Sequence, residues 1–237
     1  MKIYYDFHIH SCLSPCGDND MTPNNIVNMA AIKRLDAIAI TDHNSGENAK
    51  AAIEAAGELP LTVIPGMEIE TSEEIHMVAL FKDTDSLAKM QEIISAHLPG
   101  VKNKPALFGE QIIMDKHDKV LGFKEQFLIT ACSMDIFETV HTVRSLGGVV
   151  FPAHIDKSSY SVLSNLGSIP DELEFTTVEI KKNPIPQNLC EMGIDNKYNV
   201  LHNSDAHYLW DISEKENFLE CKSASIEDIL HKISECI

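Results

Sequence analysis

Residues 3–10 read IYYDFHIH and residues 37–43 read AIAITDH. Each is a run of apolar, β-branched or aromatic residues that ends in histidine or aspartate. Runs of this kind predict short buried strands. Because the polar residues come where each strand ends, these two segments set the pattern by which the rest of the chain is interpreted.

Predicted strands and helices alternate along most of the chain. We expect strands at 3–7, 37–41, 61–64, 75–81, 149–151, 176–180 and 200–201, and helices at 22–33, 47–56, 85–97, 135–146 and 225–236. Repeated strand–helix units predict an α/β protein whose parallel sheet is covered by helices, as a barrel or a doubly wound sheet. The pattern breaks down over 99–130, where 112–122 resembles a hairpin. We interpret this stretch as an insertion within one domain that spans residues 1–237.

The chain is strongly acidic, with 19 Lys and Arg against 36 Asp and Glu and a net charge of −17. Neutralising a nucleic-acid backbone needs a basic face, so we expect no extended nucleic-acid binding and no docking on anionic lipid. Six cysteines without a C-x-x-C pair are too few for a disulfide framework. No secretory signal and no membrane-spanning stretch is evident, so we expect a soluble, cytoplasmic protein. The sequence indicates no oligomeric state.

Histidines and carboxylates gather at the predicted strand ends, which face one mouth in a parallel barrel. His8 and His10 lie two residues apart in an extended strand, so both point to one face and can reach one cation. The others at strand ends are Asp42, His43, Glu68, His154, Asp205 and His207. Mixed imidazole and carboxylate ligands favour Zn, Mn or Fe. The sequence therefore predicts a metal site at this mouth.

His76 calls for a different connection. Only seven residues separate it from Glu68, whereas a parallel crossover needs about a dozen or more. We therefore expect the strands at 61–64 and 75–81 to form a hairpin that turns near 72–73 and brings His76 beside Glu68. The alternative is a solvated acidic loop with His76 at its base.

Six segments carry a family resemblance. They are DFHIHS at 6–11, ITDHN at 40–44, PGME at 65–68, HMVAL at 76–80, PAH at 152–154 and NSDAH at 203–207. In this order they resemble the PHP family, named for polymerase and histidinol phosphatase. The resemblance implies a distorted seven-stranded (β/α) TIM-like barrel with two or three divalent metal ions at its C-terminal mouth. It also implies an enzyme that hydrolyses phosphate esters.

The resemblance also implies three sets of metal ligands. They are His8, His10, Glu68 and Asp205 for one metal, Glu68, His76 and His154 for a second, and His43, His207 and a residue after His10 for a third.

The loop that follows His10 offers two candidates for the last ligand. Counting back from Thr22 favours Asp18, a carboxylate that keeps the site insensitive to oxidation. Counting forward from His10 favours Cys16, whose thiolate would favour Zn or Fe and make activity sensitive to oxidation. The sequence leaves both open, with a slight preference for Asp18.

The predicted function is metal-dependent hydrolysis of a small phosphorylated metabolite or nucleotide by a metal-activated hydroxide. The catalytic residues are expected to be Glu68, Asp205 and His207. Two alternatives are a metallohydrolase acting on C–N or carboxyl ester bonds and a metal-loaded regulatory module without turnover.

Four further residues are candidates for supporting roles. Lys157 and Lys181 follow predicted strands at the mouth and are candidates for binding the substrate phosphate. Asp6 and Asp42 are candidates for orienting imidazole N–H groups, with turn capping as the alternative.

Overall fold

Strands and helices alternate along the chain in the computed structural model, which describes residues 1–236. The first half contains β1 (Lys2–Ile9), α1 (Pro23–Ile32), β2 (Ala37–Ile40), α2 (Ala49–Ala56), β3 (Thr62–Glu70), β4 (His76–Leu80), α3 (Thr84–His97), α4 (Pro105–Phe108), β5 (Ile112–Met114) and β6 (Val120–Phe123). The second half contains α5 (Ile136–Ser145), β7 (Val149–Pro152), α6 (Val162–Leu166), a 3-10 turn (Asp171–Leu173), β8 (Thr177–Glu179), α7 (Gln187–Glu191), α8 (Ile194–Lys197), β9 (Asn199–Leu201), a second 3-10 turn (Leu209–Asp211), β10 (Phe218–Glu220) and α9 (Ile226–Ser234).

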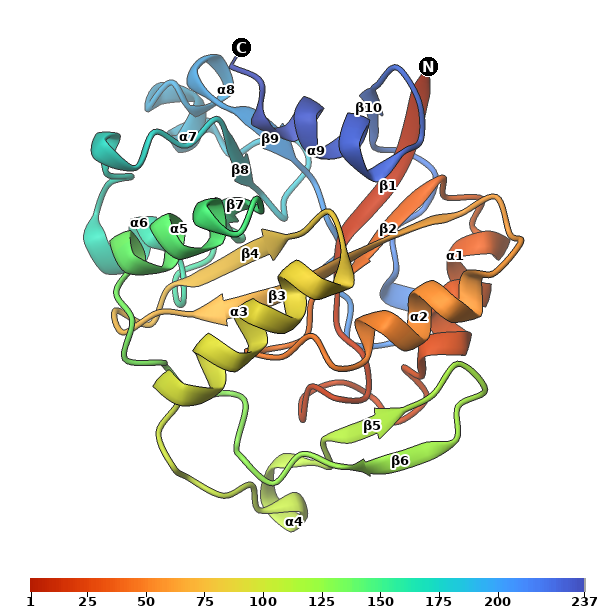
Figure 1. The fold of residues 1–237 in the computed structure, drawn as a ribbon. Helices are drawn as coiled ribbons and strands as arrows, with labels where there is room; N and C mark the ends of the chain where they lie inside the picture. The colour runs from red at the N-terminus through yellow and green to blue at the C-terminus, as the bar shows by residue number, and fades with distance from the viewer. Residues whose placement is uncertain (237) are drawn as a thin grey trace.

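The largest sheet has six strands in the order β10-β1-β2-β3-β4-β7 (Figure 1). Strands β1, β2 and β3 are parallel, whereas β4 is antiparallel to both β3 and β7. Strand β10 is antiparallel to β1 at the other edge. Strands β8 and β9 form a separate parallel pair. The mixed α/β class is confirmed, but the connected sheet has six strands rather than the seven expected.

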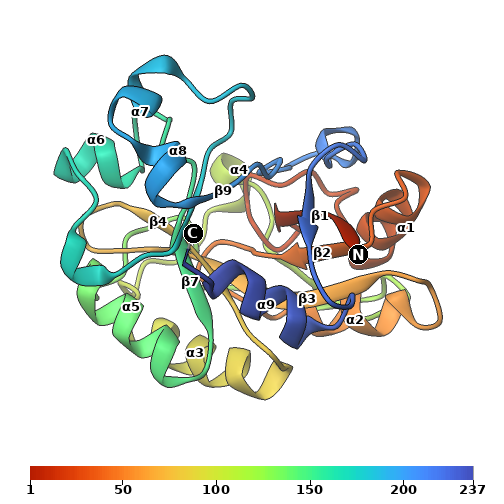
Figure 2. The same ribbon diagram turned by 90° about the horizontal axis from the view of Figure 1, so that it is seen from above.

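Side chains alternate between two packed clusters across the sheet. On β2, Ile38 and Ile40 pack in a cluster with residues of α1, α2 and α3, whereas Ala37 and Ala39 pack in a second cluster with α9. This alternation follows from the two-residue period of a strand. Figure 2 shows α9 across the centre of the molecule, with α1 and α2 on one side and α3 and α5 on another.

Local sequence explains where the helices begin. Thr22 accepts a hydrogen bond from the Asn25 N–H ahead of α1, and Pro23 occupies the first turn, as expected for a helix start. Helix α5 begins with a capping box between Asp135 and Glu138.

The strands β3 and β4 form the expected hairpin, in which Glu70 pairs with His76. Strand β3 is longer than predicted and ends at Glu70, so Glu68 lies inside the strand rather than beyond it. The reason is that hydrogen bonding to β4 extends β3 past its apolar run.

The stretch 99–130 contains α4 and the hairpin β5–β6, which extend at the bottom of Figure 1. All six cysteines are free thiols. Within residues 1–236, no helix has the length and apolar character that crossing a membrane requires.

Candidate metal centre

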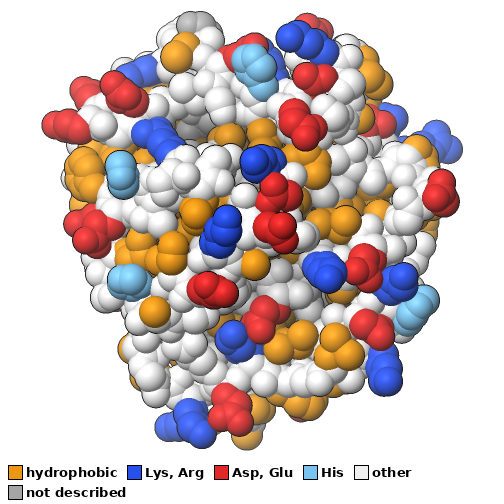
Figure 3. Space-filling model, in the orientation of Figure 1, with side chains coloured by type: hydrophobic (Ala, Val, Ile, Leu, Met, Phe, Trp, Pro, Cys, Tyr) orange, Lys and Arg blue, Asp and Glu red, His pale blue; other side chains and the backbone are white. Residues whose placement is uncertain are grey.

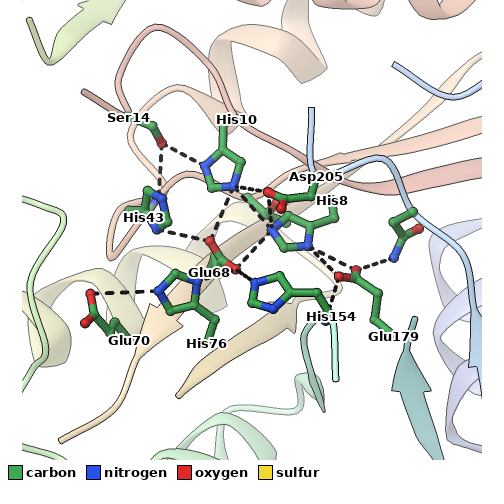
Figure 4. Close-up of polar contacts among 12 residues, drawn as sticks. His8, His10, Ser14, His43, Glu68, Glu70, His76, His154, Glu179 and Asp205 are labelled. Carbon is green, nitrogen blue, oxygen red and sulfur yellow. Dashed lines mark hydrogen bonds and ion pairs between the residues drawn. The ribbon is translucent and has the colours of Figure 1, made fainter. Parts of the chain in front are cut away.

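Glu68 lies at the centre of a cluster of imidazoles (Figure 4). Its side chain is buried, and five histidine rings approach its two oxygens. The nitrogen–oxygen distances are 3.2 Å for His8, 3.3 Å for His10, 3.0 Å for His43, 2.9 Å for His76 and 3.3 Å for His154. The strands that carry these residues are far apart in sequence, so only the curled sheet brings the rings together.

His8 and His10 point to the same place, as their spacing predicts. Their Nε2 atoms lie 3.2 Å apart, and the Nε2 atom of His10 lies 3.3 Å from Asp205 Oδ1. The pairing of β1 with β2 shifts register between Asp6 and Ile9. Such irregularities turn side chains out of the regular alternation, and they are common beside active sites.

The backbone is unusual at three positions around the cluster. Asn44, His154 and Asp205 have φ angles of 48°, 31° and 50°, in the region that L residues rarely adopt. A positive φ at a non-glycine residue costs about 1–3 kcal/mol and persists where surrounding structure enforces it. At His154 and Asp205 this conformation belongs to side chains that face Glu68 or His10.

Glu179, at the end of β8, is a candidate site residue that the sequence analysis missed. It is buried, and both of its carboxylate oxygens lie 3.0 Å from His8 Nδ1. It also accepts hydrogen bonds from the His154 N–H at 2.9 Å and from the Asn203 amide at 2.7 Å. The His8 proton is therefore held on Nδ1, which leaves Nε2 free to bind a cation. It lies inside the predicted strand 176–180, so a rule that selected residues just past a strand did not include it.

Asp42 acts on an imidazole through a serine. The Ser14 hydroxyl donates to Asp42 Oδ1 at 2.7 Å, and its oxygen lies 3.0 Å from His10 Nδ1. Since the hydroxyl proton goes to Asp42, the oxygen accepts the proton of His10 Nδ1. Asp6 instead accepts the backbone N–H groups of Ser204 and Ser213, so it braces the loop that carries Asp205.

A second cluster of ligand atoms lies beside the first, with all its members within 4.8 Å of one another. It consists of one atom each from Cys16, His43, His207 and His10. Cys16 comes from the loop after β1, His43 follows β2 and His207 follows β9. Among the described residues Asp18 is not part of this group, and its carboxylate accepts the Asp20 N–H at 2.8 Å. Of the two loop candidates, the structure therefore brings Cys16 to the imidazoles.

The charges of the cluster shift its pKa values in both directions. Although burial opposes charge, nearby imidazoles hold the pKa of Glu68 well below its usual value. Against the effect of burial, Glu179 and Glu68 raise the pKa of His8, and Asp205 and Glu68 raise that of His10 to about 9.

Two other imidazoles favour the neutral form. Burial, followed by the nearby His10, lowers the pKa of His43 to about 3 and that of His207 to about 4. Neutral imidazole is the form that binds metals.

A cavity of about 260 Å³ opens over the cluster. Among its lining residues are Cys16, Lys157 and Tyr160. Lys157 Nζ lies 2.5 Å from Asp205 Oδ2, and Lys181 Nζ lies 3.7 Å from the same oxygen. Both lysines are partly exposed, and Lys157 lines the cavity.

The donor set fits divalent cations. Within residues 1–236, the buried His43 Nδ1 and Glu68 Oε2 atoms lie 3.0 Å apart, yet neither has a hydrogen-bond partner. Buried polar groups are normally paired, so unpaired atoms in one cluster indicate a missing partner. Close approach of two imidazole Nε2 atoms, as in His8 and His10, also fits a shared cation. Histidine nitrogen and carboxylate oxygen are typical ligands of Zn and related metals.

Comparison with known proteins identifies a matching family model and two curated relatives. A family model described as the PHP domain matches residues 6–143. The chain is 31% identical over 176 residues to the 5'-3' exoribonuclease Rnm of Escherichia coli. The matched region covers 63% of this chain and 57% of that protein. It is 35% identical over 125 residues to Rnm of Salmonella typhimurium, covering 41% of this chain and 40% of that protein. The chain thus spans about half the length of the curated relatives it matches.

The fold is also similar to that of a solved structure. The lesion-specific endonuclease PfuEndoQ from Pyrococcus furiosus aligns with a TM-score of 0.74 and 17% identity, covering 99% of this chain and 56% of that one.

The expectation of a small phosphorylated partner without extended nucleic-acid binding is wrong. The curated relative Rnm is an exoribonuclease, and the structural neighbour PfuEndoQ is an endonuclease, so both act on nucleic acids. The net charge of −17 led to this error. A sum over the whole chain says nothing about the potential in one pocket, where bound cations reverse the local charge. On the face shown in Figure 3, basic and acidic side chains are interspersed rather than segregated.

Proposed function

Because this chain belongs to the PHP domain family, we propose that it is a metal-dependent hydrolase that cleaves phosphodiester bonds in nucleic acid. The observation that carries the proposal is the convergence of five imidazoles on the buried Glu68. Nucleic acid as the substrate is supported by the similarity to Rnm, an exoribonuclease.

The centre would hold two or three divalent cations, drawn from Zn, Mn and Fe. The ligand sets are His8, His10, Glu68 and Asp205 for the first, Glu68, His76 and His154 for the second, and His43 and His207 with a loop residue for the third. Bound cations supply an activated water and neutralise phosphoryl oxygens. Glu68, which faces both of the first two sets, is the residue on which the arrangement most depends.

Other residues would bind the substrate phosphate and orient the metal ligands. Lys157 lines the cavity and Lys181 lies beside Asp205, so both supply positive charge for a phosphate oxygen in addition to their contacts with Asp205. Glu179 and Ser14 fix the ring orientation of His8 and His10. The cavity, at about 260 Å³, is slightly smaller than the roughly 300 Å³ of the smallest usual ligand pockets, so we expect it to take one phosphate and its adjoining sugar rather than a longer segment.

The arrangement of strands supports a closed, seven-stranded barrel within one domain that includes 99–130 as an insertion. The Ile155 N–H donates to Glu179 O at 2.9 Å, which joins the end of β7 to β8. Ile9 forms a parallel bridge with Ala206, which joins the end of β1 to the segment after β9. These links would close β1, β2, β3, β4, β7, β8 and β9 into a ring.

The test compares the wild type with Glu68→Gln, each loaded with Mn²⁺ or Zn²⁺. Single-stranded RNA and DNA of one sequence are the substrates, and p-nitrophenyl phosphate represents a monoester. We expect cleavage of a nucleic acid by the wild type and a loss of about a thousandfold or more in Glu68→Gln, because metal ions contribute several kcal/mol to such reactions. Glu220→Gln, which makes the same charge change on the exposed end of β10, should retain activity. Wild-type rates no higher than those of Glu68→Gln on every substrate would refute the proposal.

A further inference from the structure

Cys16 is the one cysteine among the described residues whose sulfur lies with several imidazole nitrogens. Its Sγ, a nitrogen of His43 and a nitrogen of His207 all lie within 4.8 Å of one another, together with a nitrogen of His10. The His10 Nε2 atom also faces Glu68 and Asp205. Cys16, His43 and His207 are therefore the members of this group that are free to form a separate site.

Backbone hydrogen bonds hold the loop that carries Cys16. The Gly17 N–H donates to Ser14 O at 2.8 Å, and the Asp18 N–H donates to His207 O at 2.9 Å, which ties the loop to the segment that bears His207. A Cβ at Gly17 would lie 2.5 Å from Ser11 O, so the close turn requires glycine. The position of the Cys16 sulfur is therefore set by the backbone around it.

Gly109, in the stretch 99–130, packs against the same loop. It packs against Pro15 O so closely that a Cβ there would overlap the oxygen.

The two histidines present nitrogens suited to a cation. His43 is 5% exposed, and because its Nδ1 faces Glu68 Oε2 at 3.0 Å, its Nε2 is the nitrogen left for a further ligand. His207 Nδ1 lies 2.9 Å from Asp205 O, to which it donates its proton, so Nε2 keeps the free electron pair. Each ring therefore has one nitrogen engaged by the protein and one left for a ligand, beside the Cys16 sulfur.

We propose that the Cys16 thiolate, His43 and His207 form a thiolate–imidazole subsite that selects Zn²⁺ over Mn²⁺. Sulfur is a soft ligand, and thiolate with imidazole is typical of zinc sites, whereas carboxylate and water suit manganese. The neighbouring ligands Glu68 and Asp205 are carboxylates, so the centre combines two subsites of different metal preference. The inference names a metal of the proposed centre, and it rests on the proposed function only in requiring that the centre binds divalent cations.

The first experiment follows cobalt, which replaces zinc and absorbs light. Apoprotein is titrated with Co²⁺, and thiolate ligation is detected as a sulfur-to-cobalt charge-transfer band in the near ultraviolet. We expect the band in the wild type, in Asp18→Asn and in Cys236→Ser, an exposed cysteine outside the site. Cys16→Ser should lose the band and bind Zn²⁺ about 10–100-fold more weakly, while its Mn²⁺ affinity changes less than about threefold.

The second experiment needs no variant. X-ray absorption of the wild type loaded with Zn²⁺ should show sulfur in the first shell at about 2.3 Å. Cobalt or zinc bound without sulfur ligation, or a band that survives in Cys16→Ser, would overturn the thiolate subsite and leave the proposed function standing. Failure of the wild type to bind any divalent cation would overturn both.

Discussion

Glu179→Gln tests whether residues behind the ligands control the metal centre. The glutamine keeps the size of the side chain but replaces one acceptor oxygen with an NH₂ donor. In the structure, Glu179 accepts from three donors, the His8 Nδ1–H, the His154 N–H and the Asn203 amide. The Asn203 amide is itself oriented, because its oxygen accepts the Phe7 N–H at 2.9 Å. An NH₂ group at position 179 therefore meets at least one buried donor that has no alternative acceptor.

The expected losses of stability and of metal affinity follow from this mismatch. A buried donor left unpaired costs about 1–3 kcal/mol, which should appear as lower stability to urea. His8 also loses the carboxylate that fixes its ring, and loss of such a partner lowers metal affinity or activity by about 10–100-fold. The expected loss of stability is a minority of the roughly 5–15 kcal/mol typical of folded proteins, so the variant should remain folded.

The assay is a competition titration of apoprotein with Zn²⁺ against a chromophoric chelator, combined with hydrolysis of the best nucleic-acid substrate. Glu220→Gln is the control for the change in charge, and it should match the wild type. Zinc affinity and turnover of Glu179→Gln both within about threefold of the wild type would show that Glu179 does not orient His8, and the reasoning would fail.

Two further predictions concern stability. Removing metal with a chelator should lower the melting temperature by about 5–10 °C relative to protein with cation at about 100 times its Kd, because such binding contributes about 2.7 kcal/mol; an unchanged midpoint in calorimetry would count against bound metal. Asp83→Ala should cost about 1 kcal/mol at neutral pH, because Asp83 accepts the Ser86 N–H at the start of α3. That hydrogen bond lowers the pKa of Asp83, so the difference between variant and wild type in urea should be full above about pH 4 and vanish as the pH falls through the lowered pKa. A difference that is the same at pH 2.5 and pH 7 would contradict it.

Much of the fold follows from local sequence, and its exceptions have identifiable causes. The alternating apolar runs gave β1, β2, β4 and the long helices close to their bounds, because strand and helix periodicity are local properties. The short helices α6, α7 and α8 and the strand β10 were not predicted, since segments of three to five residues carry too little periodic signal. The order of the six strands in the connected sheet was not predictable either, because periodicity does not show which strand edges pair.

The candidate site was likewise predicted in part from the sequence. Residue types and their order along the chain indicated a cluster of imidazoles and carboxylates, and the spacing from Glu68 to His76 indicated the hairpin that joins them. The net charge misled us about the partner, because it sums charges without their positions.

The amino-acid sequence by itself determined which side chains are available for metal chemistry and on which strand ends they stand. Only the tertiary structure decided that Glu179 holds His8, that Ser14 links Asp42 to His10, and that Cys16 rather than Asp18 faces the histidines. The physical reason is that these contacts join segments up to 191 positions apart, as between Cys16 and His207. Their distances are fixed by the curl of the sheet, the irregularity in β1 and the tight turn at Gly17, which act together only once the chain has folded.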